Sequence, residues 1–438
     1  MRGAVHSYLE YAIDYASAGM YEEATQLLSF VAEGNEATYP MVYYALGYFA
    51  SKMGKKDEAL NLYKKAETMC PDYCFPNKLE EVLMLNDAMS LNPEGAKAPY
   101  YLGNFHYAAR IYDEAIACWE KSASIDDTYP TVLRNLSLAY YNKQHNPQKA
   151  LATLEKAYNL DTTDARILME LDQLYKKLRY PHRQRLDFLE AHADVVEQRD
   201  DLCIERITLY NQLGEYQKAY DLINSRKFHP WEGGEGKVTS QYLLCRVELA
   251  KIAIREGRFA DAVRLLKETE KYPDNLGEGK LSMAEENDIH YWMGCAYEGL
   301  GEEALAKEYF TKATKGSAEP AIAFFYNDQQ PDKIFYQGLA WRKLGEEDKA
   351  RSRFNRLIKH GEKHLFDKVK IDYFAVSLPD LLIWDDDLNV RNQIHCNLVM
   401  GMGYLGLGDK EQARKFLSEV ARLDINHQAG KQLLEMCG

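Results

Sequence analysis

The chain has 438 residues, enough for two or three ordinary domains or for one long repeat array. Hydrophobic residues make up 46% of it, which supports a sizeable core and excludes a disordered chain. The net charge of −13 argues against nucleic acid as the main partner, since phosphate contacts need clustered Lys and Arg. No apolar run is long enough to cross a membrane, and the start of the chain lacks the apolar segment of a signal peptide.

The eight cysteines include no Cys-x-x-Cys pair, and most lie in apolar helical surroundings where cysteine acts as a small hydrophobic residue. Cys70 and Cys74 flank Pro-Asp-Tyr, so metal binding or oxidation there is the alternative to reduced structural thiols. Reduced thiols fit a reducing compartment. We therefore expect a cytoplasmic protein without a metal or another cofactor.

The first predicted helix begins almost at residue 1 with no capping element ahead of it, which is how a solenoid cut from a longer protein looks. A clear pattern follows in YYALGYFASKMGKKDEALNLYKKAETMCP (43–71), where Leu46 and Gly47 precede Ala59, Tyr63 and Pro71. A Leu-Gly pair, then Ala-x-x-x-aromatic, then Pro resembles the tetratricopeptide repeat, a unit of two antiparallel helices.

The same frame recurs after a single predicted helix at about 78–91. Small residues let two helices approach closely and aromatic residues fill the space between them, so we expect Gly103 to face Ala115. The resemblance implies an all-α, right-handed superhelical solenoid of about ten helix hairpins, with almost no strand. Its clear copies contain Gly103 and Trp119, Gly294 and Phe310, Gly338 and Phe354, and Gly401 and Ala413, and weaker copies centre on Ala24, Ala150, Phe188, Ala219 and Ala262.

The repeat step changes near residue 225. It is close to the family's roughly 34 residues in the first half and becomes 43 or 44 residues from Ala219 to Ala262, Ala306 and Ala350. This change divides the chain into a short-step array, 1–225, and an array with long inter-repeat loops, 226–438. The extra residues fall between successive hairpins, at 226–238, 271–286, 316–332 and 362–390.

Two of these loops carry related sequences, GGEGKV and LGEGKL. Equivalent loops of a solenoid stack on one edge, so we expect a continuous ridge there. One interpretation makes the ridge a binding surface, and the alternative is that the loops only pack together and stiffen the array. The candidate ridge residues are Trp231, Glu235, Lys237, Glu278, Lys280 and Trp384.

A second candidate surface comes from the family resemblance. Repeat domains that grip the acidic tails of chaperones use Asn and Lys or Arg side chains of the first helices. Asn104 and Asn135 match the two asparagines of that clamp in position and spacing. Tyr100 stands where the first lysine belongs, and Met169 or Glu170 where the arginine belongs, so peptide backbone recognition is the remaining expectation.

No motif of an enzyme or of a metal site is complete. GGEGK lacks the first glycine and the Ser or Thr of a phosphate loop. His360 and His364 flank Glu362 with the wrong spacing for a zinc protease, and Gly361 suggests a helix end there. WDDDLN (384–389) predicts an acid-capped helix start, and the basic stretch 179–185 predicts a solvated helix end.

These observations indicate a non-catalytic scaffold that binds a protein or an extended peptide, with no nucleic acid and no membrane insertion. The alternative partner is another domain of the same native chain. On its GEGK loops and its DYFAVSLPDLL stretch, the C-terminal half resembles the helical-repeat tails of large bacterial proteins. The alternative function is an accessory helical region of a larger carbohydrate-active enzyme, with Trp231 and Trp384 stacking on sugar.

Overall fold

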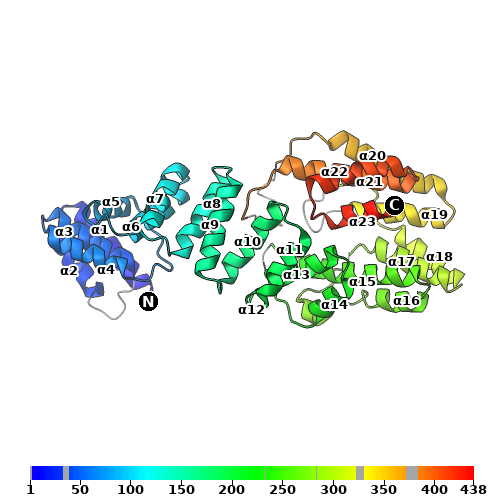
Figure 1. The fold of residues 1–438 in the computed structure, drawn as a ribbon, viewed down its shortest axis with the longest axis horizontal. Coiled ribbons are helices and arrows are strands. Elements are labelled where there is room, and N and C mark those ends of the chain that lie inside the picture. Colours follow the sequence, from blue (N-terminus) through cyan, green and yellow to red (C-terminus); the bar gives the residue numbers. More distant parts are fainter. Residues whose placement is uncertain (1, 33–38, 232, 283, 322–329, 371–382) are drawn as a thin grey trace. The chain divides into compact units, whose positions relative to one another are not determined.

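The computed structural model describes residues 2–32, 39–231, 233–282, 284–321, 330–370 and 383–438 (Figure 1). Over these ranges the chain forms twenty-three α-helices and one short 3₁₀ helix, and no β-strand is present in them. The expected all-α helical solenoid is confirmed. None of the helices in this part of the chain is long and apolar enough to span a bilayer.

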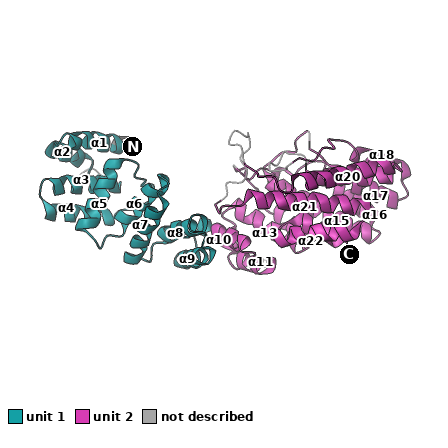
Figure 2. Ribbon diagram, turned by 90° about the horizontal axis from the view of Figure 1, so that it is seen from above, with its two compact units in different colours: residues 1–167 teal, residues 168–438 magenta. Residues whose placement is uncertain are grey.

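The helices gather into two compact units, residues 1–167 and 168–438 (Figure 2). The division expected at residues 225 and 226 concerns the repeat step, which is a different property from compactness, and it stays a prediction.

Unit 1 contains four hairpins, α1/α2, α3/α4, α6/α7 and α8/α9. The single helix expected at about 78–91 is confirmed as α5, which packs on α3 and α6. The helices are α1 (Arg2–Ser17), α2 (Tyr21–Ala32), α3 (Pro40–Lys52), α4 (Lys56–Glu67), α5 (Leu79–Leu91), α6 (Lys97–Ala108), α7 (Tyr112–Ile125), α8 (Pro130–Asn142) and α9 (Pro147–Leu160).

Unit 2 continues the hairpins and ends in a single helix, α23. Its two hydrophobic cores lie around Phe310 and Phe354. Its helices are α10 (Ala165–Lys177), which begins just before the unit boundary, α11 (His182–Ala191), α12 (Ala193–Val196), α13 (Asp200–Gln212), α14 (Tyr216–Asn224), α15 (Lys237–Arg255), α16 (Phe259–Lys267), η1 (Asp274–Leu276), α17 (Asn287–Gly299), α18 (Glu303–Ala313), α19 (Pro331–Lys343), α20 (Glu347–His364), α21 (Leu388–Leu407), α22 (Lys410–Leu423) and α23 (Gln428–Met436).

One close approach recurs within the hairpins. A Cβ atom on Gly103 would lie 2.4 Å from Trp119 Cδ1, and its three nearest heavy atoms would all belong to Trp119. Trp119 is therefore the nearest neighbour of Gly103, and the expected approach of Gly103 to Ala115, which is fully buried one turn before Trp119, stays a prediction. The glycine of a first helix receives the large side chain sixteen residues later, in the same way for Gly47 and Tyr63, Gly294 and Phe310, Gly338 and Phe354, and Gly401 and Leu417.

Gly361 does not end a helix. It lies inside α20, where a Cβ atom would come within 2.5 Å of Met400 Cγ and 2.6 Å of the Cys396 carbonyl oxygen. The missing side chain therefore lets α21 pack against α20 at this point. The expectation of a helix end failed because a buried glycine inside a helix answers to tertiary packing rather than to local propensity.

Unit 2 closes on itself through its basic stretch and its C-terminal segment. Arg185 is only 1% exposed, and its guanidinium group binds Asp172 and Glu205, each at 2.7 Å. It also donates to Asn426 Oδ1 at 3.3 Å, which joins α11 to the turn between α22 and α23. The expectation of a solvated helix end at 179–185 is therefore wrong for Arg185, whereas Arg179, Pro181, Arg183 and Gln184 are exposed as expected.

Candidate functional site

The first two inserted loops lie side by side, as the related sequences predict. The Phe228 N–H donates to the Asn275 carbonyl oxygen at 2.8 Å, and Asn275 Nδ2 donates to the carbonyl oxygens of Ile223 and Arg226, both at 2.9 Å. Gly277 has φ +78°, and a Cβ atom there would lie 2.6 Å from the Phe228 carbonyl oxygen. These contacts fix one loop on the other by backbone hydrogen bonds.

Two charged residues of this ridge, Glu278 and Lys280, form hydrogen bonds or ion pairs with neighbouring groups of unit 2. The Gly236 N–H donates to the Glu278 carboxylate at 3.0 and 3.2 Å, and burial raises the pKa of Glu278. Lys280 pairs with Glu286 at 2.5 Å and donates to the Glu270 carbonyl oxygen at 3.2 Å.

The remaining residues of the two loops differ in exposure. Glu235 and Lys237 are exposed, whereas Trp231 is half-buried and lies against Gly234, where a Cβ atom would overlap the indole ring. These loops therefore pack tightly at their bases and present only part of the expected ridge to solvent.

Trp384, the second expected ridge tryptophan, does not lie on a surface. It is only 1% exposed, and its Nε1 donates to the Glu170 carbonyl oxygen of α10 at 3.1 Å. The expected acid cap beside it is confirmed, since Asp387 accepts from the Asn389 N–H at 2.8 Å where α21 begins. The expected ridge loops 316–332 and 362–390 lie partly outside the described residues, at 322–329 and 371–382.

The two asparagines of the expected clamp are brought together in unit 1. Asn135 Nδ2 on α8 donates to Asn104 Oδ1 on α6 at 3.3 Å, and Trp119 Nε1 donates to the same oxygen at 3.1 Å. Both asparagines are half-buried, and the Asn104 amide nitrogen makes no hydrogen bond to any residue that the structure describes. Tyr100, a neutral residue that is 5% exposed, occupies the position where the clamp has its first lysine.

The structure adds one residue that the sequence frame did not mark. Arg134 Nη1 donates to Asn135 Oδ1 at 3.3 Å, so a guanidinium group lies beside the asparagine pair. Its position directly before Asn135 in the sequence gave no signal, because adjacent residues of a helix do not normally point to the same face. A cation and two amides therefore occupy this surface of α6 and α8.

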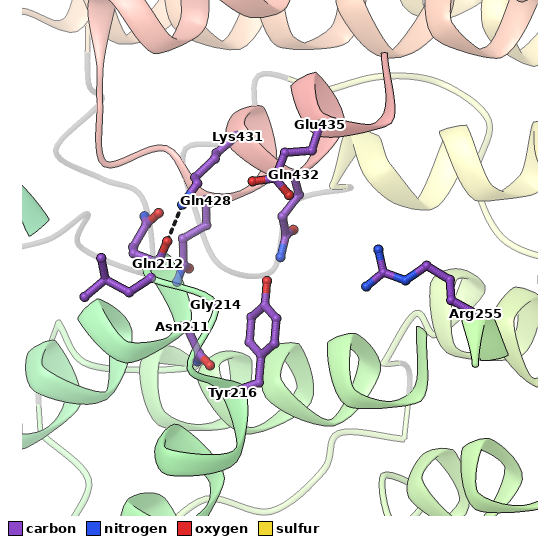
Figure 3. A pocket seen from close by; sticks show the side chains of 10 residues that line it. Asn211, Gln212, Gly214, Tyr216, Arg255, Gln428, Lys431, Gln432 and Glu435 are labelled. Atoms are coloured by element: carbon purple, nitrogen blue, oxygen red, sulfur yellow. Dashed lines mark hydrogen bonds between the residues drawn. The ribbon is translucent and has the colours of Figure 1, made fainter. Parts of the chain in front are cut away.

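In unit 2, the segment that leads into α23 and α23 itself contact α11, α13 and α15. Asn426 Oδ1 contacts His182 Nε2 at 3.2 Å, Gln241 and Gln428 join their side-chain amides at 2.9 Å, and Lys431 donates to the Gln212 carbonyl oxygen. A polar cavity of about 240 Å³ remains between α13, α15 and α23 (Figure 3). Its lining includes Asn211, Tyr216, Arg255 and Glu435.

The histidine pair on α20 is close but takes other partners. The rings of His360 and His364 lie 4.6 Å apart between centroids, and His364 Nδ1 lies 2.6 Å from Asp367 Oδ2. Burial, and next the neighbouring His364, lowers the pKa of His360. Within the described ranges no group of three or more His, Cys, Asp or Glu side chains is arranged to hold a metal ion.

The cysteines have no disulfide partners in the structure. Cys74 is buried while Cys70 is exposed, and burial raises the pKa of the Cys74 thiol to about 12.

The fold and these surfaces define an all-helical repeat protein whose candidate functional groups lie on helix faces and on the loops between hairpins. Two family models, both described as tetratricopeptide repeat, match the chain, one at residues 42–73 and 288–315 and the other at 334–360. The chain therefore contains tetratricopeptide repeats, and these repeats support a protein-interaction scaffold.

Several solved structures are similar to parts of the chain. A crystal structure of MamA has 16% identity and a TM-score of 0.25, over 43% of this chain and 95% of its own. PilF of Pseudomonas aeruginosa has 18% identity and a TM-score of 0.30, over 51% and 90%. YrrB, described as a TPR protein with an unusual peptide-binding site, has 16% identity and a TM-score of 0.29, over 50% and 95%.

Proposed function

We propose that the chain is a non-catalytic scaffold and that the surface of α6 and α8 around Asn104 and Asn135 binds an extended peptide of a partner protein. The observation that carries this proposal is the fixed orientation of the Asn104 amide. Its oxygen accepts from both Trp119 and Asn135, so its two N–H groups are left for an incoming acceptor.

The ligand follows from the chemistry of these donors. An extended peptide presents unpaired backbone carbonyl oxygens, which amide N–H groups can bind whatever the side chains are. Arg134 adds a positive charge next to the pair. Because Tyr100, Met169 and Glu170 supply no further cation, we propose recognition of the peptide backbone rather than of a terminal carboxylate.

We give the inserted loops a supporting role in this proposal. The hydrogen bond from the Phe228 N–H to the Asn275 carbonyl oxygen and the bond of Glu278 to the Gly236 N–H favour loops that stiffen unit 2. A sugar-stacking surface has little support, because Trp384 is buried and Trp231 lies against Gly234. The peptide belongs to a separate protein or to another domain of the same native chain.

The proposal is tested with a displayed library of short linear peptides and the full chain carrying Asn104→Ala and Asn135→Ala. We expect peptides captured by the parent to be lost from the double variant. Asn159→Ala is the matched control, since Asn159 is an exposed asparagine of α9. Trp119 Nε1 keeps its bond to the Tyr100 carbonyl oxygen, so the fold should survive, as a thermal melt will show. Equal capture by parent and double variant contradicts the proposal.

A further inference from the structure

Helix α1 carries three exposed tyrosines on one face. Tyr8, Tyr11 and Tyr15 are spaced by three and four residues, which places them along one side of a helix, and Tyr11 is 62% exposed. The opposite side of α1 faces the core and buries Val5, Leu9, Ala12 and Ile13. The helix is therefore apolar or aromatic on both sides, and only one of them is covered by described residues.

These tyrosines differ from those of the repeat frame. Tyr44 and Tyr63 are fully buried, and their hydroxyl groups donate to Glu67 and Asp87. The side chains of Tyr8, Tyr11 and Tyr15 make no hydrogen bond and no ring contact with any residue in the described ranges. Packing inside unit 1 therefore does not account for them.

The second helix of the hairpin also carries an exposed apolar side chain. Phe30 on α2 is 74% exposed, and Met20 at the turn is also exposed. The α1/α2 hairpin packs on α3, and α3 also packs on α4 and α5. End units of solenoids normally turn a polar face outward. The α1/α2 hairpin does not follow that rule.

From residue 5 onward, the charged residues of this hairpin have one sign. Residues 5–32 contain Glu10, Asp14, Glu22 and Glu23 and no Lys or Arg, and all four carboxylates are exposed. Glu10 pairs with Lys78 at 3.0 Å, while the other three form no ion pair with the described residues. The first-turn position of Glu22 and Glu23 suits the dipole of α2, but it leaves their outward charge uncompensated.

We propose that this tyrosine–acid face, formed by Tyr8, Tyr11, Tyr15, Met20 and Phe30 beside Asp14, Glu22 and Glu23, binds an amphipathic helix of a partner protein that carries Lys or Arg beside an apolar stripe. The occupant is a helix because the other side of this hairpin is covered by one, α3. It is basic because the rim is acidic. A second copy of the chain would bring acid against acid, which costs free energy.

The test uses the full chain and two fluorescent synthetic helices. One has a leucine stripe flanked by lysines, and its twin has glutamates in place of the lysines. Binding is followed by fluorescence anisotropy at low and at high salt. We expect the lysine helix to bind, salt to weaken it, and the glutamate twin to bind at least about tenfold more weakly.

Variants then locate the binding. Tyr11→Ser with Phe30→Ser should weaken the lysine helix about tenfold or more, as loss of aromatic anchors does. Leu281→Ser with Phe366→Ser is the matched control, because it removes two exposed apolar side chains of unit 2 and should change nothing. Asn104→Ala with Asn135→Ala should also leave this binding intact, which separates it from the peptide surface of α6 and α8.

Three results would overturn the proposal. The lysine helix fails to bind; both synthetic helices bind equally; or the serine variants and their control behave alike. Sedimentation of the chain alone then measures whether it self-associates. Self-association that is lost in the Tyr11→Ser and Phe30→Ser variant would assign this face to a second copy of the chain.

Discussion

At the scale of single residues, the repeat frame identifies the glycines correctly but not the side chain that lies nearest to them. Gly103 was expected opposite Ala115 because both are small. In the structure the side chain nearest to Gly103 is that of Trp119, since long side chains of a helix extend back toward its N-terminus and cover the turn before them. The sequence pattern gives the positions of the small residues, whereas side-chain length and direction determine which residues contact one another.

This contact gives the first prediction. Gly103→Ala places a methyl group 2.4 Å from the indole ring, so the ring must move, and we expect the free energy of unfolding to fall by about 1–3 kcal/mol. Gly279→Ala is the control, because no heavy atom would lie within 4 Å of its new Cβ atom. Urea denaturation of both variants decides the matter, and equal midpoints would contradict the packing described here.

The buried ion cluster gives a second prediction at this scale. Burial alone would raise the pKa of Glu205, but the cations Lys176 and Arg185 outweigh it and hold that pKa at about 2, against an ordinary 4.5. The stabilisation from this depressed pKa is therefore complete above about pH 4.5 and is lost as the pH falls toward 2.

Glu205→Gln should accordingly be less stable than the parent at pH 6, with the difference shrinking as the pH falls below 4.5. The measurement is the free energy of unfolding against pH, with Glu411→Gln, an exposed acid of α22, as the control. A difference between parent and Glu205→Gln that stays constant down to pH 2.5 would show that Glu205 does not titrate as described.

At the scale of elements, the paired inserted loops give the third prediction. Gly277→Ala faces two costs: a left-handed backbone, about 1–2 kcal/mol for a residue with a side chain, and a close contact with the Phe228 carbonyl oxygen. Gly257→Ala is a matched control, since it has a similar φ of +75° and no neighbour within 4 Å. We expect faster amide hydrogen exchange over 226–238 in the Gly277 variant alone. The same exchange in both variants would mean that the loops do not hold each other.

The elements also show how far the sequence could predict this structure. Periodicity describes contacts within one hairpin and between neighbours, so the hairpins, the lone helix α5 and the neighbouring loops were all predictable. The contact of Trp384 with Glu170 joins residues 214 positions apart. It depends on a small rotation per repeat summed over many repeats, which no local pattern contains. Trp384 and Arg185 were expected at the surface for that reason.

At the scale of the whole molecule, the chain divides into two compact units whose boundary falls inside α10, and unit 2 is further held by its own closure. The contacts of Asn426 with α10 and α11 and of Lys431 with α13 all lie inside unit 2. A repeat array unfolds in pieces where coupling between neighbouring parts is weaker than the coupling inside them. The division after residue 167 therefore predicts two cooperative unfolding transitions.

The last prediction uses one variant in each unit. Arg185→Ala leaves the buried carboxylate of Asp172 without its cation and should cost about 3–5 kcal/mol in unit 2, while Gly103→Ala should lower only unit 1. Hydrogen exchange measured along the chain at increasing urea concentrations reports on each unit separately. The amides of α6 and α7 report on unit 1, and those of α11 and α13 report on unit 2. If either variant lowers the protection of both units equally, the chain unfolds as one cooperative body, and the separation into two units has no energetic meaning.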